Sequence, residues 1–209
     1  MTDLYGDKEF NGIYRAIVQD NNDPKKLGRL KLYVPEIFGT SLTTDWASPM
    51  VGTLSATRLP NGSRGSWDMG TFWIPDKDMG VWCQFEAGNP SRPLWCGVWW
   101  GEPDGTSEIP KLAKGEEDYT IQTLTYPVVS GDTISDEIAE DPFDAIYPFN
   151  RVIKTKAGHV IEVDDTENAE RVKVTHNSGT FIEIGPDGSV RMKVAGDMKQ
   201  EILGNLYQK

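Results

Sequence analysis

Two histidines are the side chains of this sequence best suited to acid–base or metal chemistry. His159 and His176 lie in two related stretches of the second half, and no serine or cysteine motif of a hydrolase surrounds either one. Both are expected on turns or strand ends. The sequence therefore gives no reason to assign a catalytic role to either histidine.

The two cysteines, Cys83 and Cys96, flank a turn sequence and are too few for a disulfide framework. A loop symmetric about Asn89 and Pro90 places them opposite each other. Reduced thiols that pack as small apolar side chains are predicted. A cross-strand disulfide or half of a metal site are the alternatives, and the lack of histidine in residues 1–100 disfavours zinc.

Acidic runs and a glycine-containing loop complete the chemically interesting features. Glu116-Glu117-Asp118 and Asp136-Glu137 lack the apolar surroundings that raise the pKa of a general acid, so solvated linker charges are predicted. No helix-forming stretch follows Gly62-Ser63-Arg64-Gly65, which indicates a loop and no phosphate site. We assign no catalytic, cofactor-binding or metal-binding residue, expect no cofactor, and predict a protein that is not an enzyme.

The net charge of the 209-residue chain is concentrated in one segment. The chain has 32 acidic and 21 basic residues, a net charge of -11, and residues 101–150 hold 12 of the acidic and 2 of the basic ones. The flanking blocks are nearly neutral and lack a basic cluster, so nucleic-acid binding is not expected. The tryptophans are better explained by a barrel core and subunit interfaces. No signal peptide or apolar run of about 18 residues is present, which favours a protein made in a cytosol.

Short β-strands are the expected elements of the first block. Residues 13–20 and 29–34 are strand-like on either side of a turn, with Gly28 suited to a bulge or a positive φ. Residues 80–86 and 93–99 predict a long hairpin, and 46–50 a short strand. Five strands in about a hundred residues suit a five-stranded barrel of the OB type, which we place at residues 1–102.

The last block, residues 151–209, contains a repeat. Residues 158–163 and 179–184 align at a spacing of 21, each begins with glycine, and an acidic turn follows each, which predicts a β-meander. Residues 194–201 and 202–209 then align as two octads. Such strands need partners to cover an apolar face, and a symmetric oligomer would supply them. Between the blocks, residues 103–150 are predicted as an extended acidic linker.

The order of these motifs resembles the contractile-tail central spike and baseplate assembly protein V family, which is related to the spike of VgrG proteins. Residues 20–24, 27–30, 34–35, 70–75 and 80–93 carry the resemblance in the first block, and the octads carry it in the last. The resemblance implies an all-β homotrimer whose OB barrels bind a trimeric baseplate hub at the tail tube. The meander would lead into an intertwined trimeric β-prism, or β-helix.

By this resemblance, the protein is a non-catalytic central spike or hub–spike adaptor of a contractile phage tail baseplate. It would cap the tail tube, help pierce the host envelope, and reside in the virion after assembly in the host cytoplasm. One relative carries a lysozyme domain between barrel and prism, but residues 102–150 are too short for that fold. A metal on the trimer axis would be an alternative for the histidines, although the His-x-His pattern of some family members is absent.

The sequence before residue 12 holds no hub domain, which favours a phage or tailocin protein over a complete VgrG. Only two octads precede Lys209. A very short shaft, a truncated sequence and a separate spike-tip protein are the three explanations. The competing function is an OB-fold binding module for an oligosaccharide or single-stranded nucleic acid.

Overall fold

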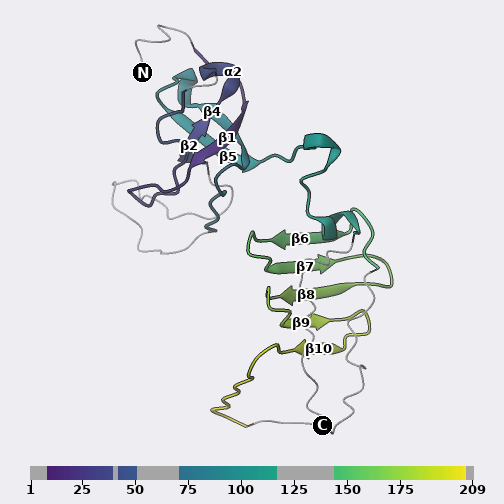
Figure 1. Ribbon diagram of the computed structural model, residues 1–209. Coiled ribbons are helices and arrows are strands. Elements are labelled where there is room, and N and C mark those ends of the chain that lie inside the picture. The colour runs from purple at the N-terminus through teal and green to yellow at the C-terminus, as the bar shows by residue number, and fades with distance from the viewer. Residues whose placement is uncertain (1–8, 40–41, 51–70, 117–143, 206–209) are drawn as a thin grey trace. The chain divides into compact units, whose positions relative to one another are not determined.

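The computed structural model describes residues 9–39, 42–50, 71–116 and 144–205. The chain forms two compact units, Met1–Ser107 and Glu108–Lys209 (Figure 1). Apart from short helical turns, both units are built from β-strands, which confirms the predicted all-β class. Over the described ranges no helix is long and apolar enough to cross a membrane.

The first unit is a curled five-stranded sheet, as predicted. Its strand order is β2-β1-β4-β5-β3, and every neighbouring pair is antiparallel except β3 with β5. One helical turn, α2, follows β2 and two 3₁₀ turns, η1 and η2, follow β4 and β5. The bounds are β1 Tyr14–Asp20, β2 Lys31–Tyr33, α2 Pro35–Phe38, β3 Ser48–Pro49, β4 Gly80–Phe85, η1 Glu86–Gly88, β5 Pro93–Val98 and η2 Pro103–Gly105.

Alternate residues of these strands form one apolar core inside the curl. The pattern of β4 is typical, since Val81, Cys83 and Phe85 are buried and the residues between them are not. Trp95 closes the core and donates a hydrogen bond from its indole nitrogen to the carbonyl oxygen of Gly28, at 3.0 Å. The buried cluster consists of Phe10, Ala16, Val18, Leu30, Leu32, Val34, Phe38, Ala47, Val81, Cys83, Phe85 and Trp95.

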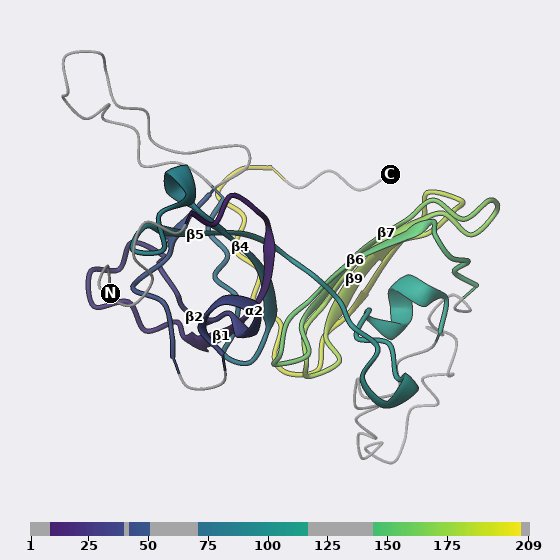
Figure 2. The ribbon, with the colours of Figure 1, turned by 90° about the horizontal axis from the view of Figure 1, so that it is seen from above.

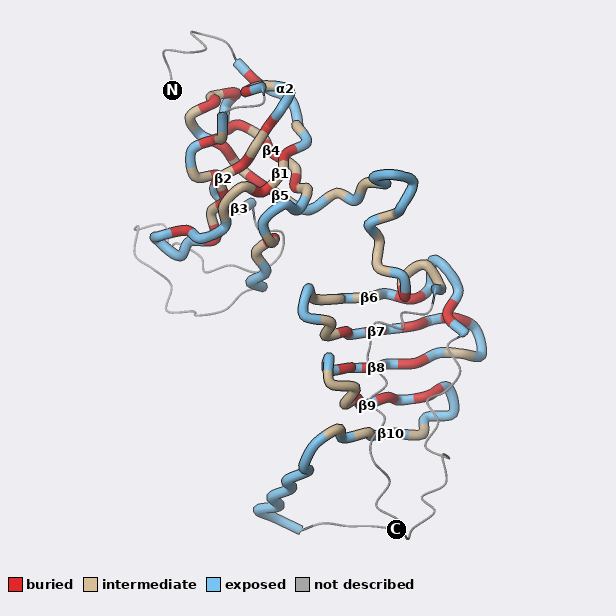
Figure 3. The backbone as a smooth tube through the Cα atoms, viewed as in Figure 1, coloured by how far each residue is buried: buried red, intermediate tan, exposed pale blue. Residues whose placement is uncertain are grey.

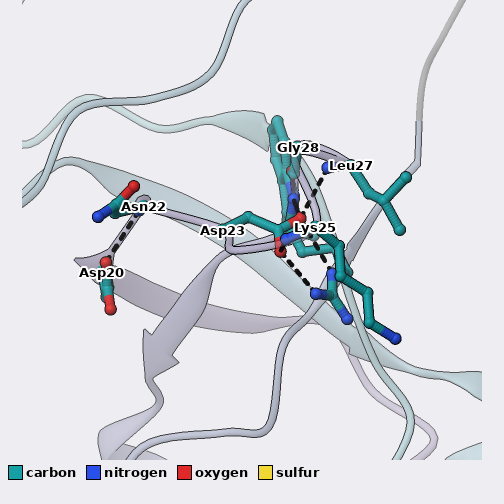
Figure 4. A network of polar contacts seen from close by, with 8 residues as sticks. Asp20, Asn22, Asp23, Lys25, Leu27 and Gly28 are labelled. Atoms are coloured by element: carbon teal, nitrogen blue, oxygen red, sulfur yellow. Dashed lines mark hydrogen bonds and ion pairs between the residues drawn. The ribbon is translucent and has the colours of Figure 1, made fainter.

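A buried carboxylate organises the predicted turn between β1 and β2 (Figure 4). Asp23 accepts hydrogen bonds from the backbone N–H of Lys25 at 2.9 Å and of Leu27 at 2.8 Å. The guanidinium of Arg29 adds two more, at 3.0 and 2.5 Å. Gly28 takes the predicted positive φ, +72°, and a Cβ there would lie 2.9 Å from the Ile74 side chain. The turn is therefore fixed by one carboxylate and one glycine.

The β4–β5 hairpin forms as expected, but its register differs from the prediction by one residue. Cys83 pairs with Trp95, and Cys96 pairs with Trp82, so the two cysteines are not opposite each other. The reason is η1, which centres the loop on Asn89 alone: Asn89 N–H donates to Glu86 at one end of the loop, and Arg92 N–H donates to Asn89 at the other. Because successive residues of a strand point to opposite faces, Cys83 faces the core and Cys96 the outer surface. Both thiols are free.

The second unit is a five-stranded antiparallel meander, which agrees with the β-meander that the repeat predicts. Its order is β10-β9-β8-β7-β6, and Figure 2 looks along this stack. A 3₁₀ turn, η3, lies against β6. The bounds are η3 Lys111–Lys114, β6 Asn150–Lys154, β7 Val160–Asp164, β8 Arg171–Thr175, β9 Phe181–Ile184 and β10 Val190–Lys193. Gly158, Gly179 and Gly188 take positive φ values in the turns.

Several predictions fall wholly or partly outside the described residues. The loop at 60–66, Glu117, Asp118, Asp136 and Glu137 all lie there, as does the middle of the predicted linker. The described part of the octads, residues 194–205, belongs to no strand of this single chain. The domain boundaries at 102 and 150 stay a prediction, and the division into compact units falls at 107.

The different environments of the cysteines predict different reactivities. Burial, with the nearby Cys96 as a smaller cause, raises the pKa of the Cys83 thiol to about 12. Because the thiolate is the reactive form, Cys83 stays inert at pH about 8 while the partly exposed Cys96 is alkylated. Mass spectrometry of the folded protein should find one adduct, at Cys96, and a second only in denaturant. A Cys96→Ser variant with undiminished labelling would contradict this assignment, as would two thiols reacting at one rate.

The Asp23 network predicts an acid-sensitive first unit. Hydrogen bonds from Arg29 and three backbone N–H groups hold the pKa of Asp23 well below its usual range. A lowered pKa stabilises the fold above the unfolded-state value, near 4, and this contribution disappears as the pH falls below it. Asp23→Asn should lower the melting temperature by several degrees at pH about 7, with a smaller difference near pH about 2.

Tryptophan fluorescence is a clean measurement for this comparison because all seven tryptophans lie within residues 46–100. The control is Asp20→Asn, since among the described residues the Asp20 carboxylate accepts one hydrogen bond, from the backbone N–H of Asn22 at 2.9 Å. Equal effects of the two substitutions, or an effect of Asp23→Asn that does not shrink at low pH, would argue against the network.

Candidate functional site

One face of the second sheet is apolar and exposed. Two rows of aliphatic side chains cross the strands on this face, and their exposed fractions run from 40% to 65%. We call this surface the apolar face. The first row is Ile153, Ile161, Val174, Ile182 and Met192, and the second is Val163, Val172, Ile184 and Val190.

The other face carries a row of charges of alternating sign. Glu162, Lys173, Glu183 and Arg191 are direct cross-strand neighbours on β7, β8, β9 and β10. Glu183 pairs with Lys173 at 3.2 Å and with Arg191 at 3.4 Å. Arg171 pairs with Glu162 at 3.1 Å. We call this row the charge ladder.

The charge ladder is buried, which reverses the usual arrangement of an antiparallel sheet. Glu183 is fully buried, and Glu162 and Lys173 are exposed by only 3% and 7%. Figure 3 shows the alternation of buried and exposed positions along β7, β8 and β9. In a sheet with one solvated face, polar residues normally point outward and apolar residues inward. The apolar face therefore is the surface of this unit that still needs a cover.

Asn150 links the charge ladder to the segment before the sheet. Its side-chain amide donates to the Leu112 carbonyl oxygen at 3.1 Å and to a Glu162 carboxylate oxygen at 3.0 Å. Leu112 belongs to η3 and is buried. Asn150, the first residue of β6, thus joins η3 of the predicted linker to Glu162 of β7.

The histidines and the acidic residue Glu116, which were considered above for chemistry, lie at turns or on the surface. His159 and His176 lie at turn ends, as predicted, and their ring centroids are 4.5 Å apart. Glu116 is half exposed and pairs with Lys114 at 3.1 Å. Within the described ranges, no three His, Cys, Asp or Glu side chains lie close enough together to hold a metal ion.

The tryptophans divide between core and surface. Trp95 is a core residue, as expected, whereas Trp73 and Trp100 are exposed by about 60%. On the outer face of the first sheet, the Arg15 guanidinium lies 5.9 Å from the Trp82 ring centre and 5.2 Å from that of Trp99. Such cation–π contacts order this surface.

Sequence reasoning missed the charge ladder, although a signal for it exists. Glu162 and Glu183 occupy equivalent positions of the 21-residue repeat, and Lys173 lies between them on the strand that joins the two copies. A cation placed between two equivalent anions is the pattern expected for cross-strand pairing. Alternation alone does not say which of the two faces is covered.

The burial of the ladder predicts a large penalty for removing one charge. Lys173→Met leaves Glu183 with Arg191 as its remaining cross-strand partner, and breaking a buried ion pair costs about 3 to 5 kcal/mol. Hydrogen exchange of peptides from residues 160–193 should accelerate markedly. The double variant Lys173→Met with Glu183→Gln should recover part of the loss, because a neutral amide replaces the buried carboxylate that has lost its Lys173 partner.

Lys156→Met is the matched control, since Lys156 is exposed in the turn between β6 and β7. This control should exchange at the rate of the unmodified protein. If Lys173→Met behaves like the control, the ladder does not stabilise the sheet.

Comparisons with known proteins find a family match for the first unit. A family model described as the type VI secretion system/phage-baseplate injector OB domain matches residues 14–100. The match covers β1 to β5, the Asp23 turn and the β4–β5 hairpin. The predicted family resemblance of the first block is confirmed.

Two phage proteins are similar to parts of the chain. Protein Gp5 of Vibrio phage KVP40 is 52% identical over 56 residues, which is 27% of this chain and 13% of the relative. The pre-baseplate central spike protein Gp5 of Enterobacteria phage T4 is 35% identical over 75 residues, 28% of this chain and 13% of the relative. The chain thus spans about an eighth of the length of these relatives. The first unit thus matches the phage-baseplate and type VI secretion injector OB domain over residues 14–100.

Proposed function

We propose that this chain is a non-catalytic structural component of a contractile phage tail baseplate, a central spike or hub–spike adaptor. The observation that carries the proposal is the injector OB-domain match over residues 14–100. A relative named as a pre-baseplate central spike protein supports it. The chain would cap the tail tube, bind a trimeric hub protein through its OB domain, and help pierce the host envelope.

The active assembly in this proposal is a homotrimer. The apolar face supports it, because two rows of exposed aliphatic side chains on five strands favour association with equivalent surfaces. Three copies related by a threefold axis can turn these apolar faces toward one another, so that the charge-ladder side of each sheet points away from the axis. The octads at 194–209 would continue the shaft as an intertwined β-prism.

Mechanical strength would be the useful property of such an assembly. Chains joined by apolar burial and backbone hydrogen bonds unfold with a high kinetic barrier, so the spike can transmit the force of sheath contraction. No covalent step is needed. The protein would assemble in the host cytoplasm and reside in the virion at the tail baseplate.

A charge on the apolar face should prevent assembly. Val174 lies in the middle of the first row, next to Ile161 and Ile182. In a trimer closed by these faces, Val174→Glu would bury three unpaired carboxylates. Burying each one costs several kcal/mol, which exceeds the stabilisation that the apolar contacts at this position contribute to the trimer. Native mass spectrometry should find a trimer for the unmodified chain and a monomer for the variant.

The control is Glu170→Gln, an exposed position just before β8. This control should remain trimeric. A monomeric unmodified chain would contradict the homotrimer, and salt-sensitive binding of oligonucleotides by that monomer would favour the competing binding-module function instead. A trimer that tolerates Val174→Glu would show that another surface holds the copies together.

A further inference from the structure

A pair of histidines lies where the paired strands β7 and β8 of the second sheet end. β7 and β8 pair Val160 with Thr175, so the next residues beyond that rung, His159 and His176, face each other. Their ring centroids are 4.5 Å apart and the ring planes are inclined by 46°. The spike function proposed above makes no use of this pair.

Hydrogen bonds of the two turns hold the rings in place. Thr155 N–H donates to the His159 carbonyl oxygen at 2.9 Å, and His176 N–H donates to that of Thr180 at 2.8 Å. Gly158 and Gly179, both with positive φ, complete the turns. The rings therefore sit on two turns that backbone hydrogen bonds close, at the end of the paired strands β7 and β8.

The two imidazoles offer their outer nitrogens. Nδ1 of His176 receives the backbone N–H of Ser178 at 3.1 Å, and Nδ1 of His159 receives that of Asn177 at a long 3.4 Å. Both Nδ1 atoms thus face the same turn. Within the described part of the chain, neither Nε2 atom has a hydrogen-bond partner.

We propose that His159 and His176 form a binding site for a divalent transition metal such as Zn²⁺. Neutral imidazole is a preferred ligand of zinc, nickel and copper. Two nitrogens that bind one tetrahedral metal at 2.0–2.1 Å lie about 3.3 Å apart, which rings at this separation reach by rotating their side-chain bonds. His176 is exposed and His159 half-buried, so water occupies the remaining coordination positions.

Ser178 supplies the partner that such a ligand needs. A histidine that binds metal through Nε2 carries its proton on Nδ1 and donates it to a neighbouring acceptor. The hydroxyl oxygen of Ser178 lies 2.8 Å from Nδ1 of His176. That hydroxyl in turn donates to the Thr180 hydroxyl oxygen at 3.4 Å, so its lone pairs are free to accept from the imidazole. Metal binding through Nε2 gives up the two backbone contacts that the Nδ1 atoms accept, from Asn177 to His159 at 3.4 Å and from Ser178 to His176 at 3.1 Å. For His176, the hydrogen bond to the Ser178 hydroxyl takes the place of the lost contact.

Zinc titration of the full chain tests the site. A Cys96→Ser background removes the partly exposed thiol, and calorimetry at pH about 7.5 should find one zinc ion per chain. His159→Gln and His176→Gln should each weaken binding by about tenfold or more. Lys156→Gln, in the same turn as His159, should bind as the parent does. Because protons compete for the imidazoles, affinity should fall steeply toward pH about 5.5.

Proton NMR of the unsubstituted chain is the second measurement and needs no variant. The sequence holds only these two histidines, so their ring signals are readily assigned, and zinc should shift both together. Failure of the Cys96→Ser chain to bind zinc would overturn the proposal. Binding that survives both glutamine substitutions, or a shift of one histidine alone, would do so as well.

Discussion

The register in which β7, β8 and β9 pair is the constraint on which the second unit depends. In this register Glu162 meets Lys173 and Lys173 meets Glu183 on one face, while Ile161, Val174 and Ile182 form a row on the other. A slip of one residue would move every side chain to the opposite face. A slip of two between β7 and β8 would set one charge of the ladder opposite an apolar or hydroxyl side chain, either Lys173 opposite Val160 or Glu162 opposite Thr175. Leaving a buried ion without its partner costs several kcal/mol. The charge pairs of the ladder therefore help to fix the register in which these strands pair.

The same register explains why the apolar face is so regular. Each aliphatic row runs straight across the strands because the turns at Gly158, Gly179 and Gly188 return the chain without a bulge in β6 to β10. An exposed and regular apolar surface is unfavourable in water for a single chain, and it suits packing against equivalent copies. The charge ladder already occupies the buried face of the sheet. The apolar face is therefore the one that stays exposed within a single chain. Both faces of the sheet agree with the homotrimer proposed above.

The sequence was sufficient to predict what depends on local pattern. Glycine spacing and alternation gave the meander, and turn chemistry gave the Asp23 turn and the positive φ of Gly28. The cysteine register was wrong by one residue, because the loop centre depends on whether η1 forms, and loop symmetry does not reveal that. The burial of Glu162 and Glu183 escaped prediction since alternation defines two faces without saying which is covered. The histidine pair depends on the pairing of two strands, which a search within single motifs does not consider.

The displaced pKa values of the described residues have structural causes. Displaced titratable groups gather at catalytic sites when a cleft leaves them open to a substrate. Here the Asp23 carboxylate is saturated by Arg29 and three backbone donors, and the Cys83 thiol is enclosed in the core. The pKa of Asp187 is lowered by hydrogen bonds from Ser189, within a turn. Each of these three groups holds a turn or fills a core, so their displaced pKa values reflect the geometry of the fold.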